Sequence, residues 1–196
     1  MPDHYFDGEP SVADDPREVT ATIWGRQHTF TTSAGVFSRD GLDHATAVLL
    51  AESEPPRTGR LLDLGCGWGA IACPVAAISP DLEVWAVDVN DRALRLTAIN
   101  AGQLGVTVRA VHPDAVPADL MFDTIWSNPP IRIGKQALHE LLLLWLPRLT
   151  PDGTARLVVG KNLGADSLQR WLIEQGWPTT RVASARGFRV LEIQRA

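Results

Sequence analysis

Three adjacent residues, Asn128, Pro129 and Pro130, follow the apolar run "FDTIW". Such a run is typical of a buried strand, and prolines end a strand because they have no N–H for the sheet ladder. A proline also holds the residue before it in an extended conformation. The segment therefore offers hydrogen-bond acceptors, the Asn128 side-chain oxygen and backbone carbonyls, with few donors. This acceptor set can bind an exocyclic amino group through both of its N–H groups.

Hydrogen bonding of this kind changes the chemistry of the bound nitrogen. The lone pair of an amino group on a base or amide is delocalised into the π system. When the acceptors of this segment bind both N–H groups by hydrogen bonds, they orient the nitrogen and direct its lone pair toward a methyl donor. No strong base is needed first, because the nitrogen becomes acidic only as the methyl group arrives. The alternative is that Asn-Pro-Pro is turn punctuation alone.

A glycine-rich loop in "LLDLGCGWGA" indicates a cofactor site. Gly65, Gly67 and Gly69 follow a buried strand and precede a helix of small residues. Glycines permit a tight turn and a close approach of ligand to backbone. Asp88 ends the next strand, 23 residues after Gly65, where a carboxylate can accept both hydroxyls of an adenosine ribose. The alternative is that the glycines serve packing only.

Two further carboxylates bear on which cofactor binds. The loop also fits the dinucleotide pattern G-x-G-x-x-A, through Gly65, Gly67 and Ala70. Asp63 argues against a dinucleotide, because a carboxylate facing this loop would repel a pyrophosphate and suit the ammonium or sulfonium of S-adenosyl-L-methionine. Asp114, or the backbone beside it, is a candidate for reading the adenine amino group. We predict S-adenosylmethionine as the cofactor.

Alternating strand and helix patterns must position these residues. Strands are predicted at "RLLDLG", "EVWAVDV", "VTVRAV", "FDTIWS" and "TARLVVG", and helices at "AIACPVAAI", "DRALRLTAINAGQL", "ALHELLLLWLPRL" and "SLQRWLIEQ". "TTRVASA" and "GFRVLEIQ" predict an antiparallel hairpin at one sheet edge. The pattern predicts an α/β fold with a Rossmann-like, seven-stranded, mostly parallel sheet and helices on both faces. Asn128 then lies at the carboxyl end of the fourth strand, beside the first, where open α/β sheets bind ligands.

The first part of the chain predicts a small β extension. "VTATIWGRQHTFTT" alternates around Gly25 and Arg26, as a β-hairpin does. "LDHATAVLLAES" has helical spacing, with Asp43 as its N-cap. Pro74 is expected early in its helix or at a kink. We expect a single domain over residues 1–196, with the extension at 1–34 and the catalytic core at 35–196.

Composition excludes several classes of protein. The chain has 196 residues, of which 45% are hydrophobic and 21% charged, as in a globular domain. No apolar run approaches the roughly 20 residues of a membrane span, and the start lacks a signal pattern. We therefore expect a cytoplasmic protein. Cys66 and Cys73 suggest no disulfide framework, and the five histidines show no metal-ligand spacing.

Charge is distributed unevenly along the chain. The formal charge is −10 over residues 1–130 and +5 over residues 131–196, which contain both lysines, Lys135 and Lys161. This asymmetry permits an anionic partner along one face. Arg132 and Lys135 are candidates for phosphate contacts near the Asn-Pro-Pro segment, although solvated charges at a helix start are the alternative.

Taken together, "LDLGCGWG", "AVDVN" and "FDTIWSNPPIRIGK" resemble S-adenosylmethionine-dependent methyltransferases of the seven-strand Rossmann-like class. Asn-Pro-Pro followed by Ile-Arg-x-Gly-Lys, with "HYF" and "SAGVFSRDGLDHATAVLL" upstream, resembles the guanine-N2 methyltransferases of small-subunit ribosomal RNA. The resemblance covers nearly the whole chain, from about His4 to Ala196.

This resemblance implies a substrate and a set of site residues. The substrate would be the exocyclic N2 amino group of a guanosine in small-subunit (16S) ribosomal RNA, free or in the subunit. Asn128, Pro129 and Pro130 would hold the amino group, with Ile131 flanking the base. Several family members carry a second, degenerate copy of the domain that helps RNA binding, whereas we expect this chain to be the catalytic unit alone. The predicted cofactor residues are Phe37, in a "GVFS" segment that closes over the cofactor, and Asp63, Gly65, Cys66, Gly67, Asp88, Val89, Asn90 and Asp114.

Two other functions stay open. A glutamine-N5 protein methyltransferase or an adenine-N6 nucleic-acid methyltransferase would use the same acceptors, although those relatives usually carry an aromatic residue where this chain has Ile131. A catalytically silent S-adenosylmethionine-binding module that docks on RNA is a different class, and the intact Asn128 and Asp88 weigh against it. Most of the seven tryptophans are expected in the core and not stacked on bases.

Overall fold

The computed structural model describes residues 10–195, apart from the side chain of Arg132. "HYF" and its family-level signal lie outside the described residues. The main sheet consists of β3 (Arg60–Leu64), β4 (Glu83–Val87), β5 (Arg109–Val111), β6 (Phe122–Ser127), β7 (Leu149–Gly160), β8 (Thr179–Ala185) and β9 (Phe188–Gln194). Their order is β5-β4-β3-β6-β7-β9-β8. The first five are parallel, and β9 is antiparallel to both β7 and β8. The predicted sheet and its closing hairpin are confirmed.

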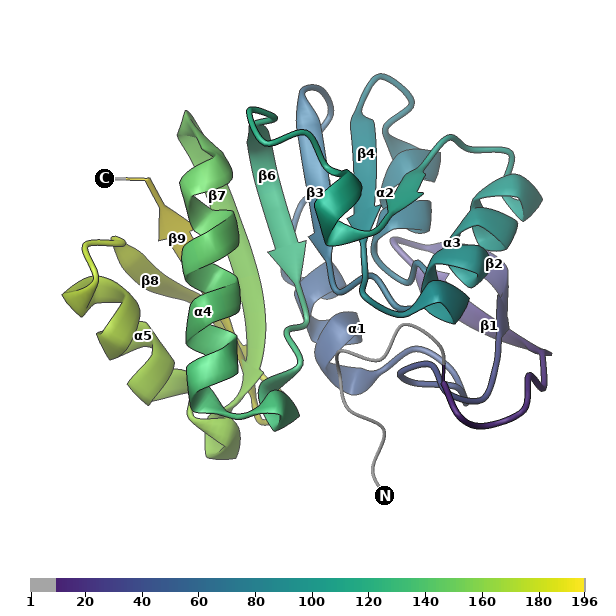
Figure 1. Cartoon of the computed structure of the whole chain (residues 1–196), viewed down its shortest axis with the longest axis horizontal. Coiled ribbons are helices and arrows are strands. Elements are labelled where there is room, and N and C mark those ends of the chain that lie inside the picture. Colours follow the sequence, from purple (N-terminus) through teal and green to yellow (C-terminus); the bar gives the residue numbers. More distant parts are fainter. Residues whose placement is uncertain (1–9, 196) are drawn as a thin grey trace.

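Helices cover both faces of this sheet (Figure 1). Helices α1 (His44–Ala51), α2 (Ala72–Ile78) and α3 (Asp91–Gln103) pack on one face, and α4 (Lys135–Trp145) and α5 (Ala165–Glu174) on the other. The apolar run of β3 is continuous because both faces of the strand are buried. Leu61 belongs to one core cluster and its neighbour Leu62 to the other. Short 3-10 turns are η1 (Pro113–Ala115), η2 (Ile131–Ile133), η3 (Leu146–Arg148) and η4 (Lys161–Leu163).

Several local predictions hold. Asp43 caps α1 and accepts hydrogen bonds from the backbone N–H groups of Ala45 and Thr46. Pro74 is the third residue of α2, where the missing N–H costs no helical hydrogen bond. All seven tryptophans lie within the two core clusters or pack against them.

Two strands, β7 and β5, begin three or more residues away from their predicted starts. β7 begins at Leu149, five residues before the predicted "TARLVVG", because Leu149 pairs with Phe122 across an irregularity in the ladder. β5 is shorter than "VTVRAV" and consists of three residues at the sheet edge, where it has a neighbour on one side only.

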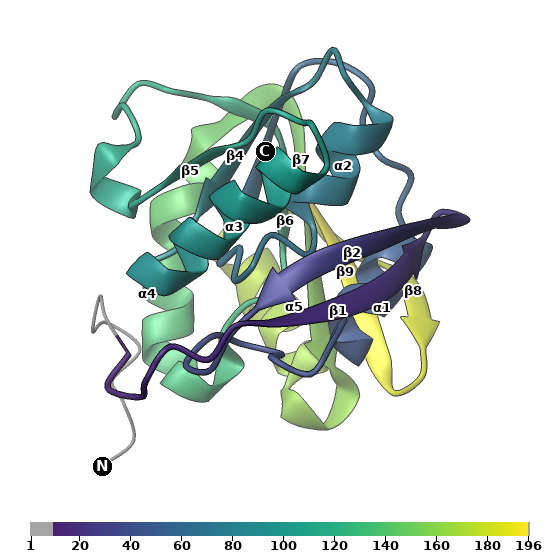
Figure 2. The same cartoon turned by 90° about the vertical axis from the view of Figure 1, so that its right-hand side faces the viewer.

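The N-terminal hairpin forms a separate two-stranded sheet (Figure 2). Strands β1 (Arg17–Ile23) and β2 (Arg26–Thr32) are joined by Trp24 and Gly25, one residue earlier than predicted. Both turn residues have positive φ, 46° and 75°, which matches the twist of a tight hairpin. The buried side chain of Asn100 on α3 bonds the backbone N–H and carbonyl of Thr31 and also the carbonyl of Trp68. This amide joins the hairpin to the loop after β3.

No helix within residues 10–195 is both long enough and apolar enough to span a membrane.

Candidate active site

A cavity of about 520 Å³ opens at the carboxyl ends of the parallel strands. The loops after β3, β4 and β6 meet there because parallel strands end at the same edge of the sheet. The end of β7, the start of β9 and the segment after β2 complete the wall. The cavity brings together ten of the predicted residues: Phe37, Gly65, Gly67, Asp88, Val89, Asn90, Asn128, Pro129, Pro130 and Ile131.

The other predicted residues do not line this cavity. Cys66 is buried beside it and lines a small adjoining hollow, and burial raises the pKa of its thiol well above the usual value. Asp114 is exposed on η1, and Lys135 is exposed at the start of α4. Arg132 is in η2, with its side chain outside the described part. Asp63 is completely buried beneath the glycine loop.

The three glycines of the loop have two different roles. Gly65 and Gly67 have positive φ, 77° and 57°, and a Cβ atom built on either would have no neighbour within 4 Å. A Cβ on Gly69 would instead lie 2.7 Å from Sγ of Cys73. Gly65 and Gly67 therefore leave open space for a ligand against the backbone, while Gly69 allows close packing of α2.

The Asp88 carboxylate is held in a fixed position at the cavity wall. Its Oδ2 accepts from the Gly67 N–H at 2.9 Å, and its Oδ1 accepts from the Asn90 N–H at 3.0 Å. Burial raises the pKa of Asp88, and these backbone bonds partly oppose that shift. Each oxygen retains a lone pair. The carboxylate can thus accept from the two hydroxyls of a ribose.

Asn90 caps a helix and connects two segments of the cavity wall. Its side-chain oxygen caps α3 through the N–H groups of Arg92 and Ala93, and its amide nitrogen donates to the carbonyl of Gly35 at 2.9 Å. The side chain thereby joins the end of β4 to the segment after β2, and both line the cavity.

The Asp63 carboxylate points toward α2. Its Oδ2 accepts from the backbone N–H of Ala72, the first residue of α2, at 3.0 Å, and its Oδ1 has no partner within the described residues. Burial raises the pKa of Asp63 to about 7. Asp63 acts as the helix cap that Ile71, at the N-cap position, cannot provide. Its contact with the cofactor stays a prediction.

Asn128 is oriented by two side chains of α1 and its cap. Its Nδ2 donates to Oδ2 of Asp43 at 2.9 Å and to Oγ1 of Thr46 at 3.0 Å. An ionised carboxylate only accepts, so the amide nitrogen must face Asp43 and the oxygen must face the other way. No donor among the described residues is bonded to the Asn128 Oδ1. The sequence identified Asp43 only as a helix cap and missed this second contact.

The prolines form a tight turn. The Ile131 N–H donates to the carbonyl of Pro129 at 2.8 Å around Pro130, whose φ of −73° and ψ of 72° match an inverse γ-turn. The Ile133 N–H bonds the carbonyl of Pro130 at 3.0 Å. The backbone carbonyls are therefore partly used by the chain itself. Each keeps one lone pair for a ligand.

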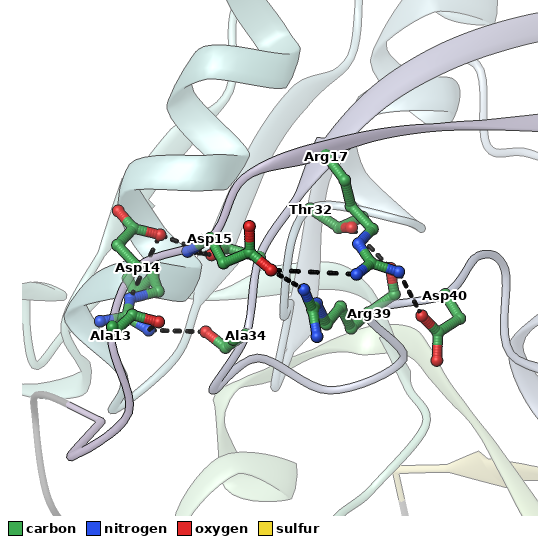
Figure 3. A network of polar contacts seen from close by, with 10 residues as sticks. Ala13, Asp14, Asp15, Arg17, Thr32, Ala34, Arg39 and Asp40 are labelled. Atoms are coloured by element: carbon green, nitrogen blue, oxygen red, sulfur yellow. Dashed lines mark hydrogen bonds and ion pairs between the residues drawn. The ribbon is translucent and has the colours of Figure 1, made fainter.

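A polar network holds the wall formed by the segment after β2 (Figure 3). The guanidinium of Arg92, buried at the start of α3, donates to the carbonyls of Ala34 and Val12 at 2.6 and 2.9 Å. Arg39 pairs with Asp15. These contacts fix residues 33–40 beside the segment that precedes β1. Phe37, 64% exposed, lines the cavity mouth.

Within the described residues, no group of three or more His, Cys, Asp or Glu side chains could hold a metal ion.

Known proteins resemble this chain over most of its length. The family model described as methyltransferase small domain matches residues 27–192. The uncharacterized protein YbxB of Bacillus subtilis is 31% identical over 200 residues. The match covers 100% of this chain and 100% of YbxB. The ribosomal RNA small subunit methyltransferase C of Pectobacterium atrosepticum is 38% identical over 143 residues, which are 69% of this chain and 40% of that protein.

A solved structure shares the fold closely. The T. thermophilus 16S rRNA N2 methyltransferase RsmC, in complex with AdoMet and guanosine, superimposes with a TM-score of 0.83 at 26% identity. The match covers 95% of this chain and 52% of RsmC, so the chain spans about half the length of that protein. The chain belongs to the methyltransferase small domain family, whose cofactor is S-adenosylmethionine.

Proposed function

We propose that this protein transfers a methyl group from S-adenosylmethionine to the exocyclic N2 amino group of a guanosine in small-subunit (16S) ribosomal RNA. The observation that carries the proposal is the fixed orientation of Asn128, whose Nδ2 is bonded to Asp43 and Thr46 within the wall of the cavity. Its Oδ1 is left to accept an amino group. RsmC and the small subunit methyltransferase C proteins support the choice of guanine in 16S rRNA.

The residues present fit the cofactor. Asp88 would bind the ribose hydroxyls, and the open backbone at Gly65 and Gly67 would lie against the ligand. When bound, S-adenosylmethionine supplies an electrophilic methyl group on its sulfonium. Phe37 and Val36, from the segment after β2, would cover the ligand and exclude water.

The acceptors of the Asn-Pro-Pro segment would prepare the nucleophile. Oδ1 of Asn128 accepts one N–H of the target amino group, and the remaining lone pair of the Pro129 carbonyl accepts the other. Both bonds turn the nitrogen lone pair out of conjugation and toward the methyl donor. Their dipoles stabilise the positive charge that develops on the nitrogen before it releases a proton from its N–H.

The substrate must be unpaired at the target. An amino group within a duplex cannot reach Asn128 inside the cavity, so the guanine has to be flipped out or already single-stranded. Lys135, exposed at the start of α4, and Arg132 beside it are the proposed phosphate contacts. We propose free 16S rRNA or an assembling small subunit in the cytoplasm as the partner.

The test uses labelled S-adenosylmethionine with small subunits, large subunits, naked ribosomal RNA, transfer RNA and release factors. Digests analysed by mass spectrometry identify the methylated product. We expect N2-methylguanosine from the small subunit or its RNA. Label on a protein glutamine or on adenine would assign the protein to the other methyltransferase classes. Cofactor binding without any methylated product would indicate a silent binding module.

A further inference from the structure

A second cavity, of about 230 Å³, adjoins the acceptor end of the first. Ile131 and Leu163 each line both cavities and form the partition between them. The second cavity lies between the first turns of α4 and α5, the helices that share one face of the sheet (Figure 1). Asn128 and this partition line the same first cavity, so the second cavity is a candidate site for the next unit of a polymer bound at Asn128.

The lining of the second cavity suits a flat, uncharged ring. Its deeper wall is apolar, formed by the buried side chains of Leu138, Val159 and Leu168. Lys135, His139 and Ser167 supply polar groups. No acidic side chain is among the lining residues, so an anionic linker passing Lys135 would meet no repulsion from the cavity wall.

An aromatic contact holds the ring of His139 in place. Its ring stacks on Trp171, with centroids 3.5 Å apart and an interplanar angle of 13°. Burial lowers the pKa of His139, and the charge of Lys135 lowers it further, so both favour the neutral imidazole. A neutral imidazole can both donate and accept at the edge of a heterocycle. The positive charge at this cavity is therefore that of Lys135.

The partition consists of two aliphatic side chains that solvent can reach. Leu163, on η4, is 59% exposed although it is large and apolar. Ile131 is only partly buried against the core. Proteins that unstack nucleic acid commonly insert such aliphatic side chains between neighbouring bases. Ile131 and Leu163 are placed to separate a base in the first cavity from a base in the second.

We propose that the second cavity binds the base of the nucleotide next to the target guanosine. The enzyme would then recognise a two-nucleotide step, with Ile131 and Leu163 between the two bases and Lys135 near the phosphodiester that joins them. This inference rests on the proposed function, because it requires a nucleic-acid substrate.

The test compares the affinity of the protein for guanosine with its affinities for the dinucleotides GpU, UpG, GpA and ApG. The protein is saturated with S-adenosylhomocysteine in each measurement. Calorimetry or ligand-observed NMR gives each affinity. We expect dinucleotides of one polarity, GpN or NpG, to bind about tenfold to hundredfold more tightly than guanosine, as a base bound against side chains does elsewhere.

A cavity-filling variant locates the effect. Ser167→Trp places an indole in the second cavity from an exposed position, and it should remove the dinucleotide advantage while leaving the affinities for guanosine and S-adenosylhomocysteine unchanged. Glu174→Trp, at the exposed end of the same helix and outside both cavities, is the matched control and should keep the advantage.

Two results would overturn the inference alone: guanosine and all dinucleotides binding equally well, or Ser167→Trp retaining the full advantage. Failure of the proposed function has a different signature, since guanosine would then bind no better than cytidine or uridine controls. In that case both proposals fall.

Discussion

Nδ2 of Asn128 lies 2.9 Å from Oδ2 of Asp43, the same oxygen that caps helix α1. One carboxylate oxygen thus fixes the start of a helix and the orientation of the proposed catalytic amide. The two residues are 85 positions apart in the chain. The arrangement makes Asp43 a positioning residue whose removal should affect turnover and stability separately.

Replacing Asp43 by alanine should lower kcat by about tenfold to hundredfold, because Asn128 loses the contact that fixes its amide. The lost cap should also cost about 1 kcal/mol of unfolding free energy. Asp43→Asn keeps a side-chain oxygen for both tasks and should restore most of kcat. Steady-state kinetics and chemical denaturation measure the two effects. Equal kcat in a folded Asp43→Ala protein would contradict the positioning role.

Asn128→Ala tests the acceptor directly. Loss of Oδ1 should reduce kcat by about 10²–10³, because the developing charge on the nitrogen loses its fixed dipole. Affinity for S-adenosylmethionine, measured by calorimetry, should stay nearly constant. A folded variant with normal turnover would indicate that the Asn-Pro-Pro segment only forms a turn.

Asp88→Ala should weaken S-adenosylmethionine binding by roughly 1–3 kcal/mol through loss of charge-assisted hydrogen bonds to the ribose. NAD should not bind measurably to the wild type. Calorimetry with both ligands is sufficient. Tight binding of NAD, or an unchanged affinity in the variant, would be inconsistent with the assigned cofactor site.

Asp63 should make stability depend on pH. Its pKa rises from 3.8 in the unfolded chain to about 7 in the folded protein, so the folded state favours the protonated form. The contribution of this group is fully present below pH 3.8 and is lost as the pH rises toward 7. Asp63→Asn keeps an oxygen for the Ala72 N–H without the charge. Its unfolding free energy, relative to wild type, should increase between pH 4 and pH 7.5 in denaturation without cofactor. A constant difference over this range would show that Asp63 titrates normally.

The sequence was sufficient for those parts of the site that follow from sheet topology. The glycine loop, Asp88 and Asn128 each directly follow a parallel strand, so the order of strands was enough to bring them to one edge. Side-chain directions beyond the strand ends were not predictable. The sequence predicts a cofactor contact for Asp63 but did not reveal the bond of its carboxylate to the start of α2, a helix with no capping side chain of its own.

Contacts across long sequence separations were missed for the same reason. The bonds of Asn128 to α1 and of Asn100 to the hairpin depend on how separate elements pack. Hydrophobic periodicity places helices on a face of the sheet but does not specify which polar groups meet between them. The γ-turn at Pro130 was also not predicted, because a turn closed by a single backbone hydrogen bond has no characteristic sequence pattern.

The wall of the large cavity draws on the chain from Pro10 to Phe188. Phe188 begins β9, the last strand in the sequence, which inserts between β7 and β8. During synthesis, β9 therefore leaves the ribosome after β8, although its place in the sheet is between β7 and β8. A nascent chain lacks the part of the cavity wall formed by Phe188 until β9 pairs with β7, so cofactor and substrate first meet the whole wall only after that late pairing.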